Sequence, residues 1–192
     1  LLAAVVIAKK YFVFSRHNAE PFWPGGPQII SNLLSKFVCK RASQGIAISN
    51  AVKSYLITRG EVPSGYTIDV VYYGFQNDIS TNAAGLGLIT NIMNSQSSNY
   101  KIGTIGRLVP QKDYHTLLNA FFNVLKSMPN TDLYVVGEGY LQKDLIELSK
   151  SLGVNDKVHW LGKTEYIKEF LSKIDLFILP SKYEGFGLVL LE

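Results

Sequence analysis

The second half of the chain alternates short apolar runs with longer stretches that have apolar residues at helical spacing. Leu133 to Val136 is a wholly apolar run of the kind that fills a buried strand, whereas Leu117, Leu118, Phe121 and Leu125 mark one face of a helix. The pattern predicts strands at residues 101–105, 133–136, 158–161 and 176–179, and helices at 113–128, 141–152, 165–174 and from 188 onward.

Strands that alternate with helices form right-handed β-α-β units, which give a parallel sheet with helices on both faces. The predicted fold class is therefore α/β and Rossmann-like. The first half of the chain follows the same pattern less regularly, and Ser49 or Asn50 is placed to cap a helix. Strands are expected there at residues 11–14, 45–48 and 68–73, and helices at 28–42 and 50–57.

Two domains are expected, because the composition changes between the two halves. Residues 77–99 are rich in Asn, Ser, Gly and Thr and carry only a weak helical pattern around Leu86 to Met93, so they are predicted to be a linker region. Residues 1–76 then form one Rossmann-like domain and 100–192 the other. The chain does not begin with Met and stops inside an unfinished helical pattern, so we expect a piece of a longer protein with both domains incomplete.

Composition narrows the class of protein. The 192 residues are 47% hydrophobic and 18% charged, which suits a folded core, and the net charge of +4 is scattered without a nucleic-acid motif. The single cysteine, Cys39, excludes an internal disulfide and is expected to be a small buried hydrophobe. The apolar run at residues 1–8 is too short to span a bilayer and is interpreted as a core helix. A cytoplasmic protein is expected, with the cytoplasmic face of a membrane as a further location.

Candidate chemistry gathers where the predicted strands end. Gly106, Arg107 and Lys112 follow the first strand of the second half, and a guanidinium with an ammonium is suited to gripping a diphosphate. Solvated loop cations are the alternative. Gly137-Glu138-Gly139 follows the next strand and resembles a truncated dinucleotide fingerprint, and Gly162-Lys163 follows the third. Cations, glycines and carboxylates are thus predicted to converge on one edge of the sheet.

The last thirteen residues read as the end of a strand, a tight loop and the start of a helix. Gly185 and Gly187 are expected to let the backbone approach an anion at the helix N-terminus. Glu184 is predicted at the mouth of the crevice, and Glu192 lies about two turns along the helix, where a carboxylate accepts vicinal hydroxyls. Two glutamates eight residues apart also occur on an ordinary solvated helix.

Taken together, these motifs resemble glycosyltransferase family 4, also called glycosyl transferases group 1. The resemblance is strong over residues 101–192 and looser over 11–74. The order and spacing that carry it are those of Gly106-Arg107-Leu108 with Gln111-Lys112, Val135-Val136-Gly137-Glu138-Gly139, Leu161-Gly162, Leu179-Pro180-Ser181 and Glu184-Gly185-Phe186-Gly187 through Glu192.

The resemblance implies a GT-B architecture and a retaining hexosyl transfer from a nucleoside-diphosphate sugar to an acceptor hydroxyl of a carbohydrate or lipid-linked molecule. Arg107 and Lys112 would stabilise the leaving diphosphate, and Glu184 would contact the transferred sugar. Further binding residues implied are Gly106, Lys163, the backbone amides of Phe186, Gly187 and Leu188, and Glu192 on the ribose. His17 would point towards the reacting sugar. No Asp-x-Asp metal motif is present, so no metal and no cofactor are expected.

The sequence departs from the family pattern at two places. Asp113 stands where the family often has Gly, and it is expected to cap the following helix. Tyr73-Gly74-Phe75-Gln76 replaces the usual Asn-Gly-Ile-Asp. Two other functions stay open: a module that binds nucleotide sugars without transfer, and a nucleotide-sugar epimerase of similar fold. A dinucleotide-dependent oxidoreductase would need a full Gly-x-Gly-x-x-Gly after the first strand, which this chain lacks.

Overall fold

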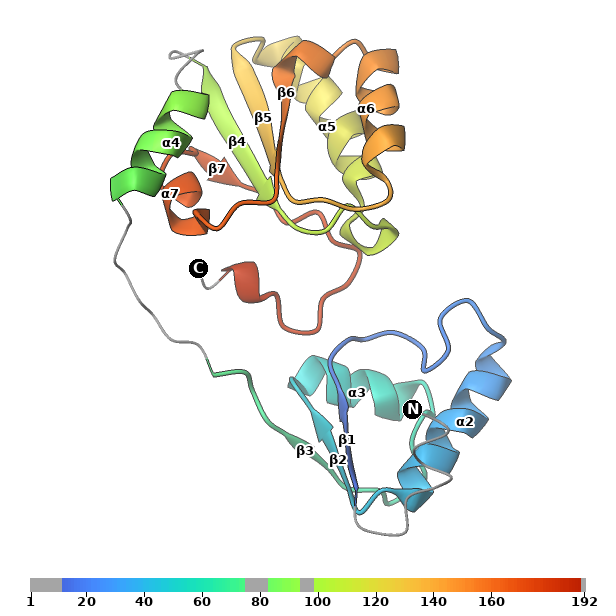
Figure 1. The fold of residues 1–192 in the computed structure, drawn as a ribbon. Coiled ribbons are helices and arrows are strands. Elements are labelled where there is room, and N and C mark those ends of the chain that lie inside the picture. Colours follow the sequence, from blue (N-terminus) through green and yellow to red (C-terminus); the bar gives the residue numbers. More distant parts are fainter. Residues whose placement is uncertain (1–11, 75–82, 94–98, 191–192) are drawn as a thin grey trace. The chain divides into compact units, whose positions relative to one another are not determined.

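The structure is a computed structural model that describes residues 12–74, 83–93 and 99–190. The chain divides into two compact units (Figure 1). The first combines residues 1–76 with 183–191, and the second contains 77–182 with Glu192. Each unit is built on its own parallel sheet. The predicted α/β fold class is confirmed, and the helix expected at residues 1–8 lies outside the described residues.

The sheet of the first unit has the strand order β1-β2-β3. Val52 and Leu56 of α3 pack with Ile68, while Val38 and Cys39 of α2 pack with Phe14, so each helix brings its own apolar cluster to the strands. Cys39 is buried as predicted, and its burial raises the pKa of the thiol to about 11. The elements are β1 (Val13–Arg16), α2 (Gln28–Arg41), β2 (Gln44–Ala47), α3 (Asn50–Thr58) and β3 (Ile68–Val70).

The second unit has the strand order β6-β5-β4-β7, with every pair parallel. The chain runs from β4 outwards to β6 and then returns to the other side of β4, so the winding reverses between β4 and β7. The elements are α4 (Ala83–Met93), β4 (Tyr100–Ile105), α5 (Tyr114–Ser127), β5 (Thr131–Val136), α6 (Gln142–Ser151), β6 (Val158–Gly162), α7 (Ile167–Leu171) and β7 (Leu176–Phe177).

Both faces of this sheet are covered, and β5 shows it directly. All six of its residues are buried. Leu133 and Val135 belong to the apolar cluster under α5 and α6, whereas Tyr134 and Val136 belong to the cluster under α4 and α7. Figure 1 shows α5 and α6 on one side of the sheet and α4 and α7 on the other. A strand buried on both faces is expected to read as a continuous apolar run, and the run from Leu133 to Val136 is the part that the sequence located. The first two residues, Thr131 and Asp132, are buried although they are polar.

Several element boundaries differ from the predictions. Helix α4 lies within the stretch predicted to be the linker, and its Ile89 and Met93 are buried with Phe170 of α7. The predicted helix at 165–174 is shorter, at Ile167–Leu171. After Gly187, the described residues form a single 3-10 turn, Leu188–Leu190, because the Leu190 N–H donates to the carbonyl three residues back.

Candidate active site

Three loops of the second unit are tied together by their backbones at the carboxyl ends of the strands. The Gly106 N–H donates to the Val136 carbonyl at 3.0 Å, and the Leu108 N–H donates to the Glu138 carbonyl at 3.0 Å. The Gly137 N–H donates to the Gly162 carbonyl at 2.8 Å. The loops that follow β4, β5 and β6 therefore lie in a row, with their positions fixed by main-chain bonds.

Two glycines are required by this close approach. A Cβ on Gly137 would stand 2.0 Å from the Gly106 oxygen, and a Cβ on Gly139 would stand 2.4 Å from the Leu108 oxygen. Gly137 also has a φ of +131°, which side chains rarely adopt. The pattern that resembles a truncated dinucleotide fingerprint thus has a structural cause, because it allows the β4 and β5 loops to touch.

A cavity of about 250 Å³ lies at these strand exits. Arg107, predicted to be catalytic, and Gly106 and Lys163, predicted to bind substrate, line it together with Glu138. The apolar residues that line it include Ile105, Val136 and Ile167. Two cations beside a glycine backbone suit a phosphate-bearing ligand, since charge-assisted hydrogen bonds to phosphate are among the strongest in proteins.

Lys112 lies beside the same loop. Its Cε is 3.4 Å from the point where a Cβ on Gly106 would stand, so the lysine stem runs along that glycine. The Tyr114 hydroxyl donates to the Gly106 carbonyl at 3.0 Å, and burial raises the pKa of Tyr114 to about 12. The phenol therefore keeps its proton at neutral pH and anchors the loop. The sequence analysis did not identify Tyr114 as part of the site.

Asp113 occupies the position where the resemblance expected Gly, and its φ of 46° is the one positive value among the described non-glycine residues. It is the N-cap residue of α5, but its side chain makes no capping bond to a backbone N–H. The expectation of a capping carboxylate was therefore wrong, because Oδ2 instead accepts from the Thr116 hydroxyl at 2.9 Å. Oδ1 lies 3.6 Å from the Lys182 Nζ, and the Lys182 N–H donates to the Gln111 carbonyl at 2.9 Å. These contacts join the β4 and β7 exits where the winding reverses.

In the first unit, His17 follows β1 and makes contacts through both ring nitrogens. Its Nε2 is 2.8 Å from the Ser15 Oγ, and its Nδ1 is hydrogen-bonded with the Tyr73 hydroxyl. His17 and Ser15 are exposed and help to line a cavity of about 440 Å³. The imidazole is thus held by neighbours while it stays accessible to a ligand.

The loop that begins at Tyr183 packs within the first unit, next to His17. A Cβ on Gly185 would stand 1.7 Å from the His17 carbonyl oxygen, and the Ser49 hydroxyl donates to the Gly185 carbonyl at 2.9 Å. Phe186 lies against the rings of Tyr72 and Tyr73. Gly185 was expected to let an anion approach. The group that lies against it, and that leaves no room for a Cβ, is instead the His17 carbonyl.

The other predicted residues of this loop differ in their exposure. Glu184 is half-buried, Leu188 is exposed, and Gly187 has a φ of +70° that explains the glycine there. Glu192 lies outside the described residues, so its predicted contact with ribose stays a prediction. The roles assigned to the other site residues also stay predictions, although the structure places Gly106, Arg107 and Lys163 around one cavity and brings Phe186 close to His17 through Tyr73.

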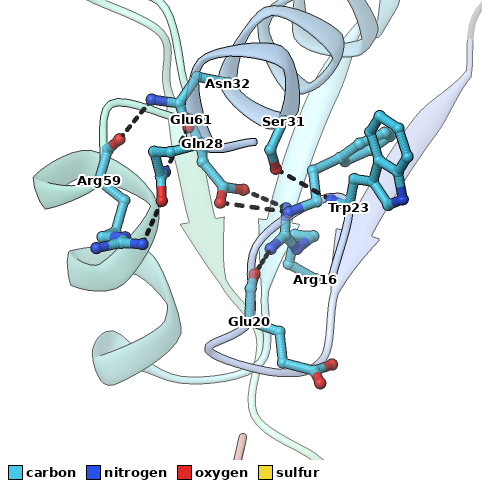
Figure 2. A network of polar contacts seen from close by, with 9 residues as sticks. Arg16, Glu20, Trp23, Gln28, Ser31, Asn32, Arg59 and Glu61 are labelled. Atoms are coloured by element: carbon cyan, nitrogen blue, oxygen red, sulfur yellow. Dashed lines mark hydrogen bonds and ion pairs between the residues drawn. The ribbon is translucent and has the colours of Figure 1, made fainter. Parts of the chain in front are cut away.

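A buried polar network holds the loop that carries His17 (Figure 2). The Arg16 guanidinium donates to the Glu61 Oε2 at 2.8 Å and also to the Glu20 carbonyl, while the Phe22 N–H donates to the Glu61 Oε1 at 3.3 Å. The Glu61 side chain is 0% exposed. This pair could not be predicted from the sequence, because the partners are 45 residues apart and belong to no motif.

The same network continues into the two helices of the unit. The Trp23 N–H donates to the Ser31 hydroxyl at 3.0 Å, and the Asn32 amide donates to the Arg59 carbonyl at 2.9 Å. Gln28 bridges Asn32 and Arg59. The Trp23 bond therefore ties the loop after β1 to α2, and the bonds of Gln28 and Asn32 tie α2 to Arg59 at the C-terminal end of α3, as Figure 2 shows.

These observations define an α/β protein whose parallel sheets present cations, glycine backbones and a histidine at their strand exits. The sequence matches the model of the family described as Glycosyl transferases group 1 over residues 89–192, which is more than half of the chain. The chain belongs to this family, and the resemblance identified from its motifs is confirmed.

Several known proteins are similar to it. The lipopolysaccharide core biosynthesis glycosyltransferase LpsE of Rhizobium meliloti is 33% identical over 89 residues, covering 46% of this chain and 25% of that protein. The uncharacterized glycosyltransferase MJ1607 of Methanocaldococcus jannaschii is 29% identical over 154 residues, covering 78% of this chain and 39% of that protein. The chain thus spans less than half the length of these curated relatives.

Solved structures agree on the fold. Anabaena HepE, crystallised with UDP and glucose, superposes with a TM-score of 0.74 at 24% identity, covering 98% of this chain and 51% of HepE. TarM of S. aureus superposes with a TM-score of 0.69 at 17% identity, covering 93% of this chain and 33% of TarM. At such identities the likeness shows the shared architecture. Among the described helices, none is both long enough and apolar enough to cross a membrane.

Proposed function

We propose that the protein containing this chain transfers a hexose-type sugar from a nucleoside-diphosphate sugar to the hydroxyl of a carbohydrate or lipid-linked acceptor, with retention and without a metal. The observation that carries the proposal is the cavity at the β4, β5 and β6 exits, where Arg107 and Lys163 lie beside the backbone of Gly106. Membership of Glycosyl transferases group 1 supports it. The reaction would take place in the cytoplasm or at the cytoplasmic face of a membrane.

The chemistry follows from where charge develops. The bond between the anomeric carbon and the phosphate oxygen breaks, and its electron pair leaves on the diphosphate. The acceptor oxygen forms the new bond on the same face, and its proton passes to the departing phosphate oxygen. Arg107 and Lys112 would stabilise the diphosphate as its charge grows, which is the kind of electrostatic assistance that contributes most to such transfers.

Binding and orientation of the sugar would fall to the other candidate residues. Glu184 would contact the transferred sugar and favour the positive charge that builds on its ring. The backbone amides of Phe186, Gly187 and Leu188 would face phosphate or sugar oxygens, and Glu192 would accept the ribose hydroxyls. His17, at the cavity of the first unit, would contact the reacting sugar.

Calorimetric titration with UDP and with UDP-glucose tests the donor site, since one relative with this fold was crystallised with UDP and glucose. We expect Arg107→Ala and Lys163→Ala each to weaken binding roughly 10- to 100-fold, because each removes a charge-assisted contact. Lys150→Ala is the matched control, because Lys150 is an exposed lysine in the last turn of α6, at the opposite edge of the sheet from the strand exits. Equal affinities in all variants would refute the assignment of the site.

Turnover separates a transferase from a module that only binds nucleotide sugars. In the complete protein, Lys112→Ala should lower kcat by about 10² to 10³, the loss typical of removing one preorganised group that stabilises developing charge. UDP release from UDP-glucose in the presence of acceptor extracts provides the assay, with circular dichroism to verify the fold. Unchanged turnover in Lys112→Ala would exclude the role proposed for this lysine.

A further inference from the structure

His17 contacts Tyr73, a residue that the sequence analysis did not include in the candidate site. Tyr73 follows β3, and its hydroxyl is hydrogen-bonded with the His17 Nδ1. The two rings lie 5.7 Å apart, centroid to centroid, at an angle of 36°. On the other side of the imidazole, the Ser15 Oγ is 2.8 Å from Nε2. Both nitrogens of His17 therefore face a hydroxyl.

The same tyrosine also contacts the loop that begins at Tyr183. Its ring meets the Phe186 ring in an edge-on arrangement, with centroids 5.9 Å apart and an interplanar angle of 80°. Aromatic pairs of this geometry contribute beyond the area they bury. Tyr73 thus contacts His17 through its hydroxyl and Phe186 through its ring, and so joins two candidate site residues that are far apart in the sequence.

The directions of the hydrogen bonds follow from the chemistry of the groups. A neutral imidazole has one nitrogen that donates and one that accepts. A phenol is a far stronger acid than an aliphatic alcohol, so the tyrosine hydroxyl is the better donor to the accepting nitrogen. Nδ1 then accepts from Tyr73, and the proton on Nε2 is donated to the Ser15 Oγ. The serine keeps its own proton to offer to another acceptor, and Ser15 lines the cavity of about 440 Å³.

We propose that Tyr73 is a positioning residue. It holds His17 as the neutral Nε2–H tautomer and fixes the position of the imidazole ring relative to Phe186. This role is a property of this chain, since Tyr73-Gly74 stands where the resemblance expected Asn-Gly. An Asn side chain has no aromatic ring, so it could not make the edge-on contact with Phe186 that Tyr73 makes. The effect of this tautomer on catalysis rests on the proposed function, whereas the assignment of the tautomer rests only on the hydrogen bonds of His17.

Tyr72 provides a matched control. It precedes Tyr73 and also contacts the Phe186 ring, with centroids 6.2 Å apart. Its hydroxyl accepts a hydrogen bond from the Asn50 amide nitrogen at 2.9 Å and not from His17. Tyr72→Phe and Tyr73→Phe therefore remove the same atom from neighbouring exposed rings, and only the second removes a partner of His17.

Nitrogen-15 NMR of the histidine rings tests the tautomer in the ligand-free chain. The chain has three histidines, and His17→Gln assigns the signals of His17. In mildly alkaline solution, we expect His17 to show a protonated Nε2 and an unprotonated Nδ1. Tyr73→Phe should move both shifts towards the average of the two tautomers, while Tyr72→Phe leaves them unchanged. A protonated Nδ1 in the unaltered chain, or no shift change in Tyr73→Phe, would overturn the proposal.

Steady-state kinetics of the complete protein test the link to catalysis. Tyr73→Phe should lower kcat with UDP-glucose roughly two- to tenfold, the effect of one lost hydrogen bond, and leave KM for UDP-glucose nearly unchanged. A changed tautomer with unchanged kcat would overturn the catalytic part of the proposal. A chain that shows the predicted tautomer shift but turns over no nucleotide sugar would contradict the proposed function and not the role of Tyr73 in holding the ring.

Discussion

Replacement of Glu61 by Ala should destabilise the first unit strongly. The Glu61 side chain is 0% exposed, and its partner Arg16 is 13% exposed, at an N–O distance of 2.8 Å. Glu61→Ala leaves the Arg16 guanidinium in a largely buried place, where it still donates to the Glu20 carbonyl but has lost its carboxylate partner. It also leaves the Phe22 N–H without the carboxylate oxygen at 3.3 Å.

The expected loss is about 3 to 5 kcal/mol of unfolding free energy, because removal of one partner of a buried pair leaves an uncompensated charge. An ordinary domain is stable by only about 5 to 15 kcal/mol, so the variant would lose a large share of its stability. The exposed pair between Lys182 and Asp113 gives the contrast, since the Lys182 side chain is 58% exposed. Breaking that pair should cost about 0 to 1 kcal/mol.

The two tryptophans allow the units to be followed separately. Trp23 lies in the loop of the first unit beside the network, and Trp160 lies in β6 of the second unit. In a Trp160→Phe background, urea unfolding followed by fluorescence reports on the first unit through Trp23. The slope of free energy against urea should stay the same in Glu61→Ala while the midpoint falls.

A double variant distinguishes the uncompensated charge from loss of packing. Arg16→Met with Glu61→Leu replaces both ions by apolar groups of similar size, which often restores or raises stability. We expect the double variant to be more stable than Glu61→Ala alone. A loss below about 1 kcal/mol for Glu61→Ala, judged against the range for buried pairs, or a double variant no better than the single one, would refute the reasoning.

Three further predictions concern backbone and side-chain features of the two units. Gly137→Ala should cost about 3 kcal/mol or more, because its Cβ would overlap the Gly106 carbonyl, whereas Gly153→Ala meets open space and should cost about 1 kcal/mol; urea unfolding followed by Trp160 compares them. Asp113→Gly should be about 1 kcal/mol more stable than Asp113→Ala in the same assay, because only glycine adopts a φ of 46° without strain. The hydrogen bond to Glu20, followed by burial, raises the pKa of Tyr183 to about 12. The stability lost in Tyr183→Phe should therefore be constant below about pH 10 and vanish as the pH rises towards about 12. A stability difference that persists at about pH 12 would contradict this.

Much of the second unit could be predicted from hydrophobic periodicity, because its sheet is covered on both faces. β5 is buried along its whole length, and α5 buries Leu117, Leu118 and Phe121 at helical spacing. Such patterns are strong wherever burial decides the residue type. Element ends were less accurate, since they depend on single hydrogen bonds. The Tyr166 N–H, for example, donates to the Thr164 hydroxyl, and α7 begins only at Ile167.

The candidate site was predicted in part. The location of Arg107 and Lys163 beside one cavity could be predicted, because parallel strands end at the same edge of a sheet and this rule needs only the strand order along the chain. Their roles stay predictions. Tyr114, Tyr73 and Glu61 were not identified, because each acts through a partner that only the folded chain brings close. Periodicity carries no information about pairs such as Arg16 and Glu61, which are 45 residues apart.

Exposure separates the cations at the strand exits into two groups with different physical tasks. Arg16 is largely buried against Glu61 and contacts the Glu20 carbonyl, so its interactions already stabilise the loop that carries His17. Arg107 and Lys163 are exposed at a cavity, so they keep their hydration until a ligand replaces it. A cation contributes to binding only through contacts that form with the ligand. Replacement of Arg16 should therefore lower stability first, whereas replacement of Arg107 should weaken nucleotide binding at nearly constant stability.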